Sequence, residues 1–381
     1  MTTPSPRTIE RAYGFDEVAI VPGDVTINPD QTNIDFKLGG NTFAFPILAA
    51  AMDGVVDPNF AILFGKLGGL AVLNLEGVQT RYEKPEDILA EITQTPDTEV
   101  TQLLQKVYSQ PIKENLIGQR IQTIKRAGVP CAVSVTPANT KRLSPIAKEA
   151  GLDILVVQST VTTARHISKS YRGLIFSELR QTLSLPILVG NCVTYSAALE
   201  VMRTGIDGIL VGVGPGAACT TREVLGIGVP QVTATMDCAA ARDTHHKETG
   251  KYVAVITDGG IRTGSDLCKA FASGADAVML GSTFARAKEA PGKGYHWGMS
   301  HPHPTLPRGT RIKVGATVTL EKLLFGPTSV TDGTENFVGA LRTAMGVCGA
   351  PTVKDMHKVK MVIAPAIKTE GKYFQAIQCA Q

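Results

Sequence analysis

The chain has 381 residues, 43% of them apolar and 19% charged, with a formal net charge of +4. This composition is typical of a soluble globular protein, and a small net charge without basic blocks gives no support for binding to nucleic acid or to a membrane surface. No apolar run reaches membrane-spanning length and the N-terminus lacks a signal-peptide core, so we expect a cytoplasmic protein.

Eight short apolar runs recur along the chain, most of them separated by helix-like stretches. The runs span residues 44–52, 69–75, 131–135, 154–157, 186–189, 208–211, 252–257 and 277–280, and the clearest helical stretches span 137–150, 194–204 and 263–273. Alternating buried strands and helices form right-handed βα units. Eight units predict an α/β fold of the TIM-barrel (β/α)8 type, with an open doubly wound sheet as the alternative. Small and polar residues follow each run, which favours the barrel.

Two segments exceed what a minimal barrel needs. Residues 77–128 are charged and helical, which indicates a surface excursion rather than a second domain. Residues 291–327 are rich in glycine, proline and histidine, which suits a flap over the barrel mouth. A closing helix is expected over 337–345. We therefore predict a single TIM-barrel domain over residues 1–381.

A glycine-rich loop after the sixth run delivers a cysteine. Residues 212–216 carry three alternating glycines, which allow the backbone to approach a ligand closely, and Cys219 stands three residues further on. Thr220 and Glu223 have the spacing of a capping box, which predicts a helix N-terminus beside the thiol. A positive helix end favours the thiolate, so Cys219 is a candidate nucleophile. The other six cysteines are scattered, and we expect buried thiols rather than disulfides or a zinc site.

Glycine turns also follow the seventh and eighth runs, at Asp258-Gly259-Gly260 and Gly281-Ser282. In TIM barrels the loops after these two strands frequently bind phosphate through backbone N–H groups. Asp258 would repel a phosphate, so we expect it to accept hydrogen bonds from sugar hydroxyls. These residues predict a sugar phosphate or a nucleotide as ligand. A metal pair at His301-Pro302-His303 is disfavoured, because no carboxylate accompanies it.

Together these motifs resemble the family of IMP dehydrogenases and GMP reductases over nearly the whole chain, from about residue 13 to residue 349. The matching stretches are Ala51-Met52-Asp53, Gly190-Asn191, Gly214-x-Gly216-x-x-Cys219-x-Thr221, Asp258-Gly259-Gly260, Gly281-Ser282, Glu289-Ala290-Pro291-Gly292, Gly298-Met299, Gly339-Ala340-Leu341-Arg342 and Gly346-Val347-Cys348-Gly349.

The resemblance implies a homotetrameric or octameric enzyme in which Cys219 attacks C2 of a purine nucleotide and Thr221 assists the reacting centre. The substrate contacts that it implies are Met52, Gly216, Asp258, Gly259, Gly260, Gly281, Ser282, Gly298 and Met299. It also implies contacts of NAD with Ser159, Thr160 and Asn191, and a potassium ion on the backbone carbonyls of Gly214, Gly216 and Cys219. Dehydrogenases of the family oxidise IMP to XMP with NAD in guanine nucleotide biosynthesis, whereas the reductases convert GMP to IMP with NADPH.

Several residues depart from the dehydrogenase pattern. The regulatory module inserted between the second and third strands of many dehydrogenases is replaced by the excursion 77–128, and Gln158 stands where the family usually has an aspartate that contacts the cofactor ribose. Ala217 replaces a serine that helps to hold the phosphate. Pro215 and residues 220–222 resemble the reductase loop.

Other residues resemble the dehydrogenases, namely the stretches 289–292 and 341–349. The arginine–tyrosine pair that activates water on the dehydrogenase flap has no clear counterpart, which leaves Arg308, taken as catalytic, and Arg311 as the flap candidates. We expect an NAD-dependent IMP dehydrogenase without the regulatory module. GMP reductase is the first alternative, and a catalytically silent nucleotide-binding protein is the second.

Overall fold

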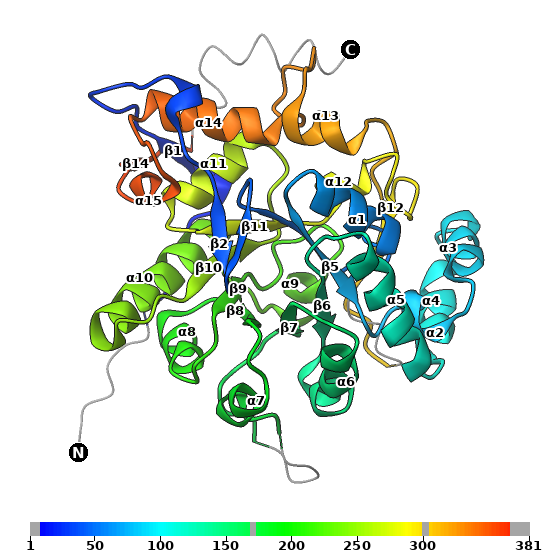
Figure 1. Ribbon diagram of the computed structural model, residues 1–381. Coiled ribbons are helices and arrows are strands. Elements are labelled where there is room, and N and C mark those ends of the chain that lie inside the picture. Colours follow the sequence, from blue (N-terminus) through cyan, green and yellow to red (C-terminus); the bar gives the residue numbers. More distant parts are fainter. Residues whose placement is uncertain (1–7, 168–172, 299–304, 366–381) are drawn as a thin grey trace.

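At the centre of the computed structural model, which describes residues 8–167, 173–298 and 305–365, is a closed barrel of eight parallel strands (Figure 1). In order around the barrel they are β4 (Ile47–Ala49), β5 (Leu70–Asn74), β6 (Ala132–Val135), β7 (Ile154–Gln158), β8 (Ile187–Cys192), β9 (Gly208–Val211), β10 (Ala254–Asp258) and β11 (Ala277–Leu280). Each predicted run overlaps one of these strands. The open-sheet alternative is excluded because β11 pairs with β4, with Val278 opposite Ile47, and this pairing closes the barrel.

Helices cover the outside of the barrel (Figure 1). They include α1 (Pro58–Lys66), α5 (Glu114–Arg126), α6 (Pro137–Glu149), α7 (Phe176–Thr182), α8 (Tyr195–Met202), α10 (Gln231–Thr249) and α11 (Gly264–Ala272). The three predicted helical stretches are confirmed as α6, α8 and α11. Side chains at the N-caps define two of these starts, because Thr194 accepts a hydrogen bond from the Ala197 amide and Thr263 forms a capping box with Asp266. The expected closing helix is α14 (Phe337–Val347), which packs on α11.

The interior of the barrel is filled with apolar side chains such as Leu48, and a hairpin closes one end of it. The hairpin consists of β2 (Phe36–Leu38) and β3 (Asn41–Phe43). Phe36 and Phe43 stack on each other and join the interior cluster. The turn of the hairpin lies at the amino end of β8, because a Cβ on Gly39 would lie 1.8 Å from Pro186. Since the hairpin occupies the amino ends of the strands, the carboxyl ends remain available for a site.

The excursion 77–128 contains three helices besides α5. They are α2 (Val78–Arg81), α3 (Pro85–Gln94) and α4 (Val100–Ser109). Helix α5 packs on α1 and α6 as a barrel helix, whereas α3 and α4 lie outside the barrel and are here called the helical lobe (Figure 1). An apolar cluster inside the lobe includes Leu89, Leu104 and Trp297. Because Trp297 belongs to the segment 291–327, the cluster joins the lobe to the predicted flap.

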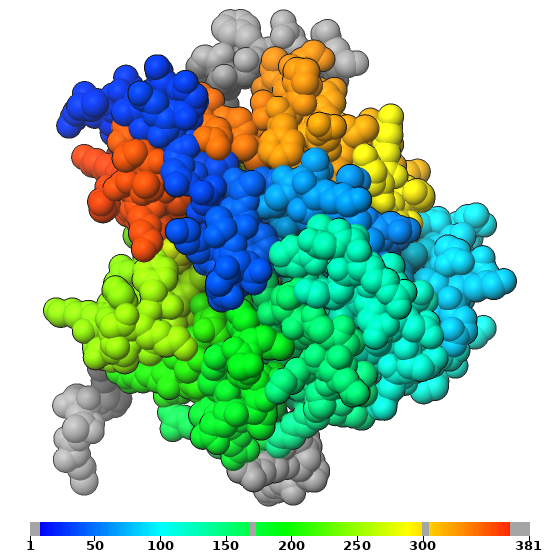
Figure 2. Space-filling model, viewed as in Figure 1, coloured from blue at the N-terminus to red at the C-terminus, as the bar shows by residue number. Residues whose placement is uncertain are grey.

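The flap segment forms a small antiparallel sheet, and a second such sheet joins distant parts of the chain. In the flap β12 (Tyr295–His296) pairs with β13 (Ile312–Lys313), and α13 (Leu320–Phe325) follows. Elsewhere β1 (Val18–Ile20) pairs with β14 (Met361–Ile363), so that the blue and red surfaces lie side by side in Figure 2. Within the described ranges, no helix is both long enough and apolar enough to cross a membrane.

Candidate active site

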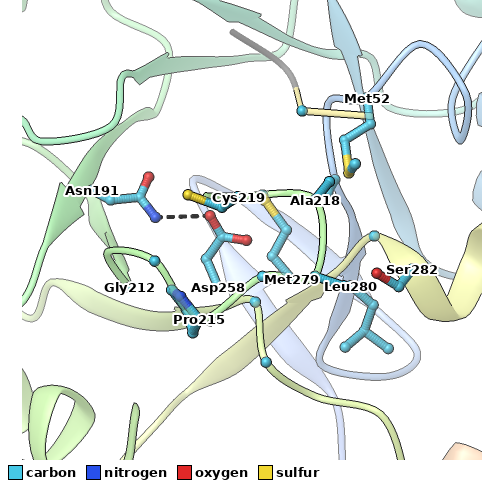
Figure 3. A pocket seen from close by; sticks show the side chains of 18 of the residues that line it. Met52, Asn191, Gly212, Pro215, Ala218, Cys219, Asp258, Met279, Leu280 and Ser282 are labelled. Atoms are coloured by element: carbon cyan, nitrogen blue, oxygen red, sulfur yellow. Dashed lines mark hydrogen bonds between the residues drawn. The ribbon is translucent and has the colours of Figure 1, made fainter. Parts of the chain in front are cut away.

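A cavity of about 200 Å³ opens at the carboxyl ends of the barrel strands (Figure 3). Of the predicted site residues it is lined by Met52, Ser159, Thr160, Asn191, Gly214, Gly216, Cys219, Asp258, Gly259, Gly260, Gly281, Ser282, Gly298 and Arg308. Thr221 does not line the cavity but touches Cys219. Met299 lies outside the described residues. The structure therefore brings together residues that are more than 200 positions apart in the sequence.

The thiol of Cys219 stands at the cavity wall with a hydroxyl beside it. Cys219 is half-buried, and its Sγ donates a hydrogen bond of 3.1 Å to Oγ1 of Thr221. Thr221 itself is only 1% exposed. A ligand in the cavity can thus reach the sulfur, while the hydroxyl that orients the thiol is held by the surrounding protein.

The helix predicted after the cysteine begins at the expected place, as α9 (Thr221–Leu225). The predicted capping box is wrong, because the Thr220 side chain makes no capping hydrogen bond. The backbone of Thr220 has φ −105° and ψ 21°, which is not the extended conformation from which an N-cap side chain reaches back to the helix amides. The hydroxyl that serves this loop is that of Thr221, which faces the thiol.

Close backbone contacts hold the cysteine loop in place. Gly212 has φ +149°, and a Cβ there would lie 2.3 Å from the Asp258 carbonyl oxygen, so only glycine permits this approach to β10. On its other side the loop pairs with the flap, since Cys219 and Gly309 form an antiparallel bridge and the Thr310 amide donates to the Ala218 carbonyl over 3.1 Å. This pairing brings the flap onto the loop and places Arg308 at the cavity.

Two neighbouring glycine turns complete the cavity wall. Gly259 and Gly260 follow β10 and have φ of +85° and +79°. Because neither residue has a side chain, their backbone atoms line the cavity. After β11, a Cβ on Gly281 would lie 2.6 Å from the Met52 sulfur. The turns predicted to bind a phosphate therefore border the same cavity as the thiol.

The carboxylate of Asp258 is met by two buried amides, those of Asn191 and Gln158, and Figure 3 draws the hydrogen bond from Asn191. Oδ2 of Asp258 accepts hydrogen bonds from Nδ2 of Asn191 at 2.8 Å and from Nε2 of Gln158 at 2.9 Å. Burial raises the pKa of Asp258 to about 6, and the two amides act in the opposite direction. In the sequence, Gln158 is distinguished only as a departure from a family pattern. Its place at the end of a buried strand, one residue before Ser159, was the available signal that it belongs to the site.

His296 is a cavity residue that sequence reasoning missed. It is buried, and neither ring nitrogen has a hydrogen-bond partner among the described residues. Burial lowers the pKa of His296 to about 4, so the ring is neutral near pH 7. The sequence around it carries no motif that would have indicated this position.

Arg311, the second flap candidate, has a structural role instead, and so does Glu289 of the matching stretch 289–292. The guanidinium of Arg311 pairs with Asp97, donates to the Ile92 carbonyl of the helical lobe, and lies 4.8 Å from the centre of the Tyr295 ring. Glu289 accepts a hydrogen bond of 3.0 Å from the first amide of α13. Arg308 is thus the flap arginine that lines the cavity.

A second cavity of about 410 Å³ adjoins the first, and Ser159 lines both. Lys141 and His166 border it, together with Thr136, Thr162 and Phe176. Its size is within the range of small-molecule sites. A two-part ligand such as a dinucleotide could place one part in each cavity.

Nothing in the described part of the chain resembles a site for a transition metal. No group of three histidine, cysteine, aspartate or glutamate residues is suitably clustered in the described ranges. His301 and His303 lie outside them.

An eight-stranded barrel with a thiol, a carboxylate and glycine turns in one cavity at the carboxyl ends of its strands has the layout of a TIM-barrel enzyme. Residues 12–300 match the family model described as the IMP dehydrogenase / GMP reductase domain, and the chain belongs to this family of oxidoreductases.

Three similar proteins illustrate the relationship. A protein of Mycolicibacterium smegmatis described as an uncharacterized oxidoreductase is 38% identical in an alignment of 366 residues that covers 94% of this chain and 98% of that protein. The inosine-5'-monophosphate dehydrogenase of Cryptosporidium parvum is 26% identical over 92% of each chain. A solved structure of an IMP dehydrogenase/GMP reductase-like protein from Corynebacterium glutamicum is 35% identical, with a TM-score of 0.90 over 95% of this chain and 97% of that one.

Proposed function

We propose that this chain is a nicotinamide-dependent oxidoreductase that acts on C2 of a purine nucleotide through a covalent adduct with Cys219. The observation that carries the proposal is the position of the Cys219 thiol, beside Thr221 and in one cavity with Asp258 and the glycine turns. In this proposal Asp258 binds the ribose hydroxyls, and backbone N–H groups at Gly260 and Gly281 bind the phosphate.

The first candidate reaction is oxidation of IMP to XMP with NAD. The Cys219 sulfur would add to C2 of the base, and a bound nicotinamide cofactor would supply the acceptor for the hydride that C2 gives up. Water then hydrolyses the thioimidate, which forms the C2 oxygen bond of XMP and returns the thiol. The balance is IMP, NAD⁺ and water giving XMP, NADH and one proton. A thiolate nucleophile suits this chemistry, and Thr221 lies where it can orient the sulfur.

The second candidate is reduction with NADPH, in which GMP loses its amino group as ammonia and C2 gains a hydride to give IMP. The flap favours this direction, because residues 305–311 contain arginines but no tyrosine. Hydrolysis of the adduct to XMP needs a base for water, and a guanidinium is not deprotonated in ordinary protein surroundings. Reductive turnover makes no such demand.

The two adjoining cavities support a site for the nicotinamide cofactor, whose chemistry is to accept or return a hydride. Ser159 borders both cavities, while Thr160 and Asn191 line the one that holds Cys219. In the second cavity Lys141 and His166 supply side chains suited to phosphate groups. This arrangement would keep the reactive end of a dinucleotide near the thiol and its phosphate-bearing end near Lys141.

We also propose a potassium ion on the carbonyls of Gly214, Gly216 and Cys219, where it would brace the cysteine loop. The Gly216 carbonyl already accepts the Cys219 amide at 3.1 Å, and its second lone pair is available to a cation. Carbonyl oxygens replace the hydration shell of potassium, but three are too few to complete one. Water or a second copy of the chain would supply the others, which agrees with the proposed homotetramer or octamer.

Assays of the purified protein distinguish the candidates. NADH formation from IMP and NAD supports oxidation, whereas consumption of NADPH with GMP supports reduction. Tight nucleotide binding without turnover in any assay would support the silent nucleotide-binding protein. In each active assay Cys219→Ala should abolish turnover and still bind nucleotide, and full activity of that variant would exclude the covalent mechanism.

A further inference from the structure

The amide of Gln158 contacts both Asp258 and Asn191. Gln158 ends β7 and is 5% exposed, and its Nε2 donates to Oδ2 of Asp258 at 2.9 Å and to Oδ1 of Asn191 at 2.9 Å. An ionised carboxylate only accepts hydrogen bonds, so the nitrogen of each amide must face Asp258. This requirement determines the orientation of both amides.

Two oxygen atoms remain without donors. Oε1 of Gln158 is buried and has no hydrogen-bond partner among the described residues. Oδ1 of Asp258 likewise receives no hydrogen bond from them, whereas Oδ2 receives two. Both side chains line the Cys219 cavity. A ligand that offers N–H or O–H groups would satisfy these acceptors, and an apolar ligand would leave them unsatisfied at a cost.

Charged groups do not explain how Asp258 is stabilised. The titratable side chains lining the same cavity are Cys219 from the cysteine loop, His296 from β12 and Arg308 from the flap. None of the described cations forms an ion pair with Asp258, whose negative charge is instead met by the amides. A carboxylate at position 158 would stand against Asp258, and the two groups would have to share a proton.

We propose that Gln158 is a positioning residue that keeps Asp258 ionised, with Oδ1 turned toward the ligand, and that its own Oε1 is a second acceptor for a ligand donor. The identity of the ligand rests on the proposed function, because a purine nucleotide supplies ribose hydroxyls and the cofactor supplies further hydroxyls and a carboxamide. The state of Asp258 does not depend on that identity.

The first test is a titration of the ligand-free protein with ¹³C-labelled aspartate, in which Asp258→Asn assigns the Asp258 carboxyl signal by NMR. The wild-type midpoint is expected at about pH 6. Gln158→Met removes a donor to the carboxylate and should raise the midpoint by about one to two pH units. In Gln158→Glu the two carboxyls should titrate as a coupled pair, with one step well above pH 6.

Gln231→Met is the matched control. Gln231 is also buried, but its Nε2 donates to backbone oxygens, those of Val211 at 2.6 Å and of Asp258 at 2.9 Å. Its loss should lower the melting temperature and leave the Asp258 midpoint in place. An unchanged midpoint in folded Gln158→Met overturns the proposal, and if that variant does not fold, an unchanged midpoint in Gln158→Glu has the same consequence.

The second test measures IMP binding by calorimetry from pH 5 to pH 8. Affinity should fall as the pH drops through the Asp258 midpoint, and the fall should begin at a higher pH in Gln158→Met. The KM for the cofactor is measured in parallel, at a pH above the Asp258 midpoints of the wild-type protein and of Gln158→Met. Of the two ligands, IMP and the cofactor, only the one that donates to Oε1 should bind more weakly to Gln158→Met at that pH. Failure of the wild-type protein to bind IMP would count against the proposed function, while the carboxyl titration would still decide the role of Gln158.

Discussion

The hydroxyl of Tyr108 donates a hydrogen bond of 2.5 Å to Oδ2 of Asp53 and so ties the helical lobe to the loop after β4. The same hydroxyl oxygen accepts a hydrogen bond of 2.6 Å from Nε1 of Trp297. Asp53 follows Met52, and Trp297 precedes Gly298, so each partner of the phenol is next to a residue of the cavity wall. Tyr108 thus connects the lobe, the barrel and the flap beside the candidate active site.

Tyr108→Phe should destabilise the protein, because it removes a donor to a buried carboxylate without changing the packing of the ring. A hydrogen bond to a charged group contributes about 1.5–3 kcal/mol, which is the expected loss in the free energy of unfolding measured by urea denaturation. Tyr82→Phe is the control, since the Tyr82 hydroxyl donates to a backbone carbonyl of Val107. The loss in that variant should be about 0.5–1.5 kcal/mol. Equal losses in the two variants would contradict a special role for Tyr108.

The pH dependence of the Tyr108 effect follows from Asp53. Burial raises the pKa of Asp53 from 3.8 to about 6, so over this window the folded state holds a proton that the unfolded state has lost. The contribution of Asp53 to stability therefore falls as the pH rises from about 4 to about 6. Removing the Tyr108 donor should raise the folded pKa further, and the destabilisation should be larger at pH 8 than at pH 5. The same loss at both values would show that Asp53 is not the group affected.

The hydroxyl of Thr221 should matter for turnover more than for binding. Thr221→Val keeps the size of the side chain and removes the atom that accepts the thiol hydrogen bond. If the proposed covalent chemistry is correct, kcat should fall by about a hundredfold while the affinity for IMP stays similar. Thr221→Ser restores the hydroxyl and should recover most of the rate. A serine variant as slow as the valine variant would show that the methyl contact, rather than the hydroxyl, is needed.

The barrel could be predicted from the sequence because buried parallel strands are continuous apolar runs, and eight such runs alternate with helices. The positions of Cys219 and Asp258 followed from the same pattern, since Asp258 comes directly after one predicted strand and Cys219 lies in the glycine-rich loop that follows another. The predicted bounds were less accurate at strand ends. The apolar run 186–189 ends before the polar residue Asn191, whereas β8 continues to Cys192.

The remaining site residues depend on contacts between segments that are distant in the sequence. His296 gives no local signal, because only tertiary packing buries it at the cavity. Arg308 and Arg311 lie three residues apart on one flap, and nothing in their spacing shows that Arg311 is held by Asp97 of the helical lobe. The capping-box spacing at Thr220 was present without the backbone conformation that a cap requires. Local pattern therefore located the site, while packing decided which side chains reach it.

Lys141 should affect the choice of cofactor if the second cavity binds a phosphate of NADPH. Lys141→Gln is expected to raise the KM for NADPH by about two- to fivefold, because Lys141 is exposed and exposed charge pairs contribute little. The KM for NADH, which lacks the additional phosphate, should change less. Arg142→Gln is the control, since Arg142 pairs with Glu114 and does not line the cavity. Equal changes in the KM for NADPH and for NADH would show that the additional phosphate does not bind at Lys141.

Replacement of potassium tests the proposed cation on the cysteine loop. Steady-state assays in potassium chloride and in choline chloride at equal ionic strength should differ, with a lower kcat in choline, because the loop that carries Cys219 would lose its brace. Nucleotide affinity should change less, since the glycine turns after β10 and β11 do not belong to that loop. The same kcat in both salts would remove the potassium proposal and leave the covalent mechanism intact.

Replacement of the two flap arginines should produce different defects, a loss of activity for Arg308 and a loss of stability for Arg311. Arg308 lines the cavity, so Arg308→Leu is expected to lower kcat/KM by about ten- to a hundredfold, the equivalent of one hydrogen bond to a charged group, with little change in stability. Arg311 has a side chain that is 4% exposed and bound to the helical lobe. Arg311→Leu should therefore lower the free energy of unfolding by about 1–3 kcal/mol. Thermal melts and initial rates of both variants check the assignment. The reverse pattern, a stable but inactive Arg311→Leu with a fully active Arg308→Leu, would show that Arg311 leaves the lobe to act at the cavity during turnover.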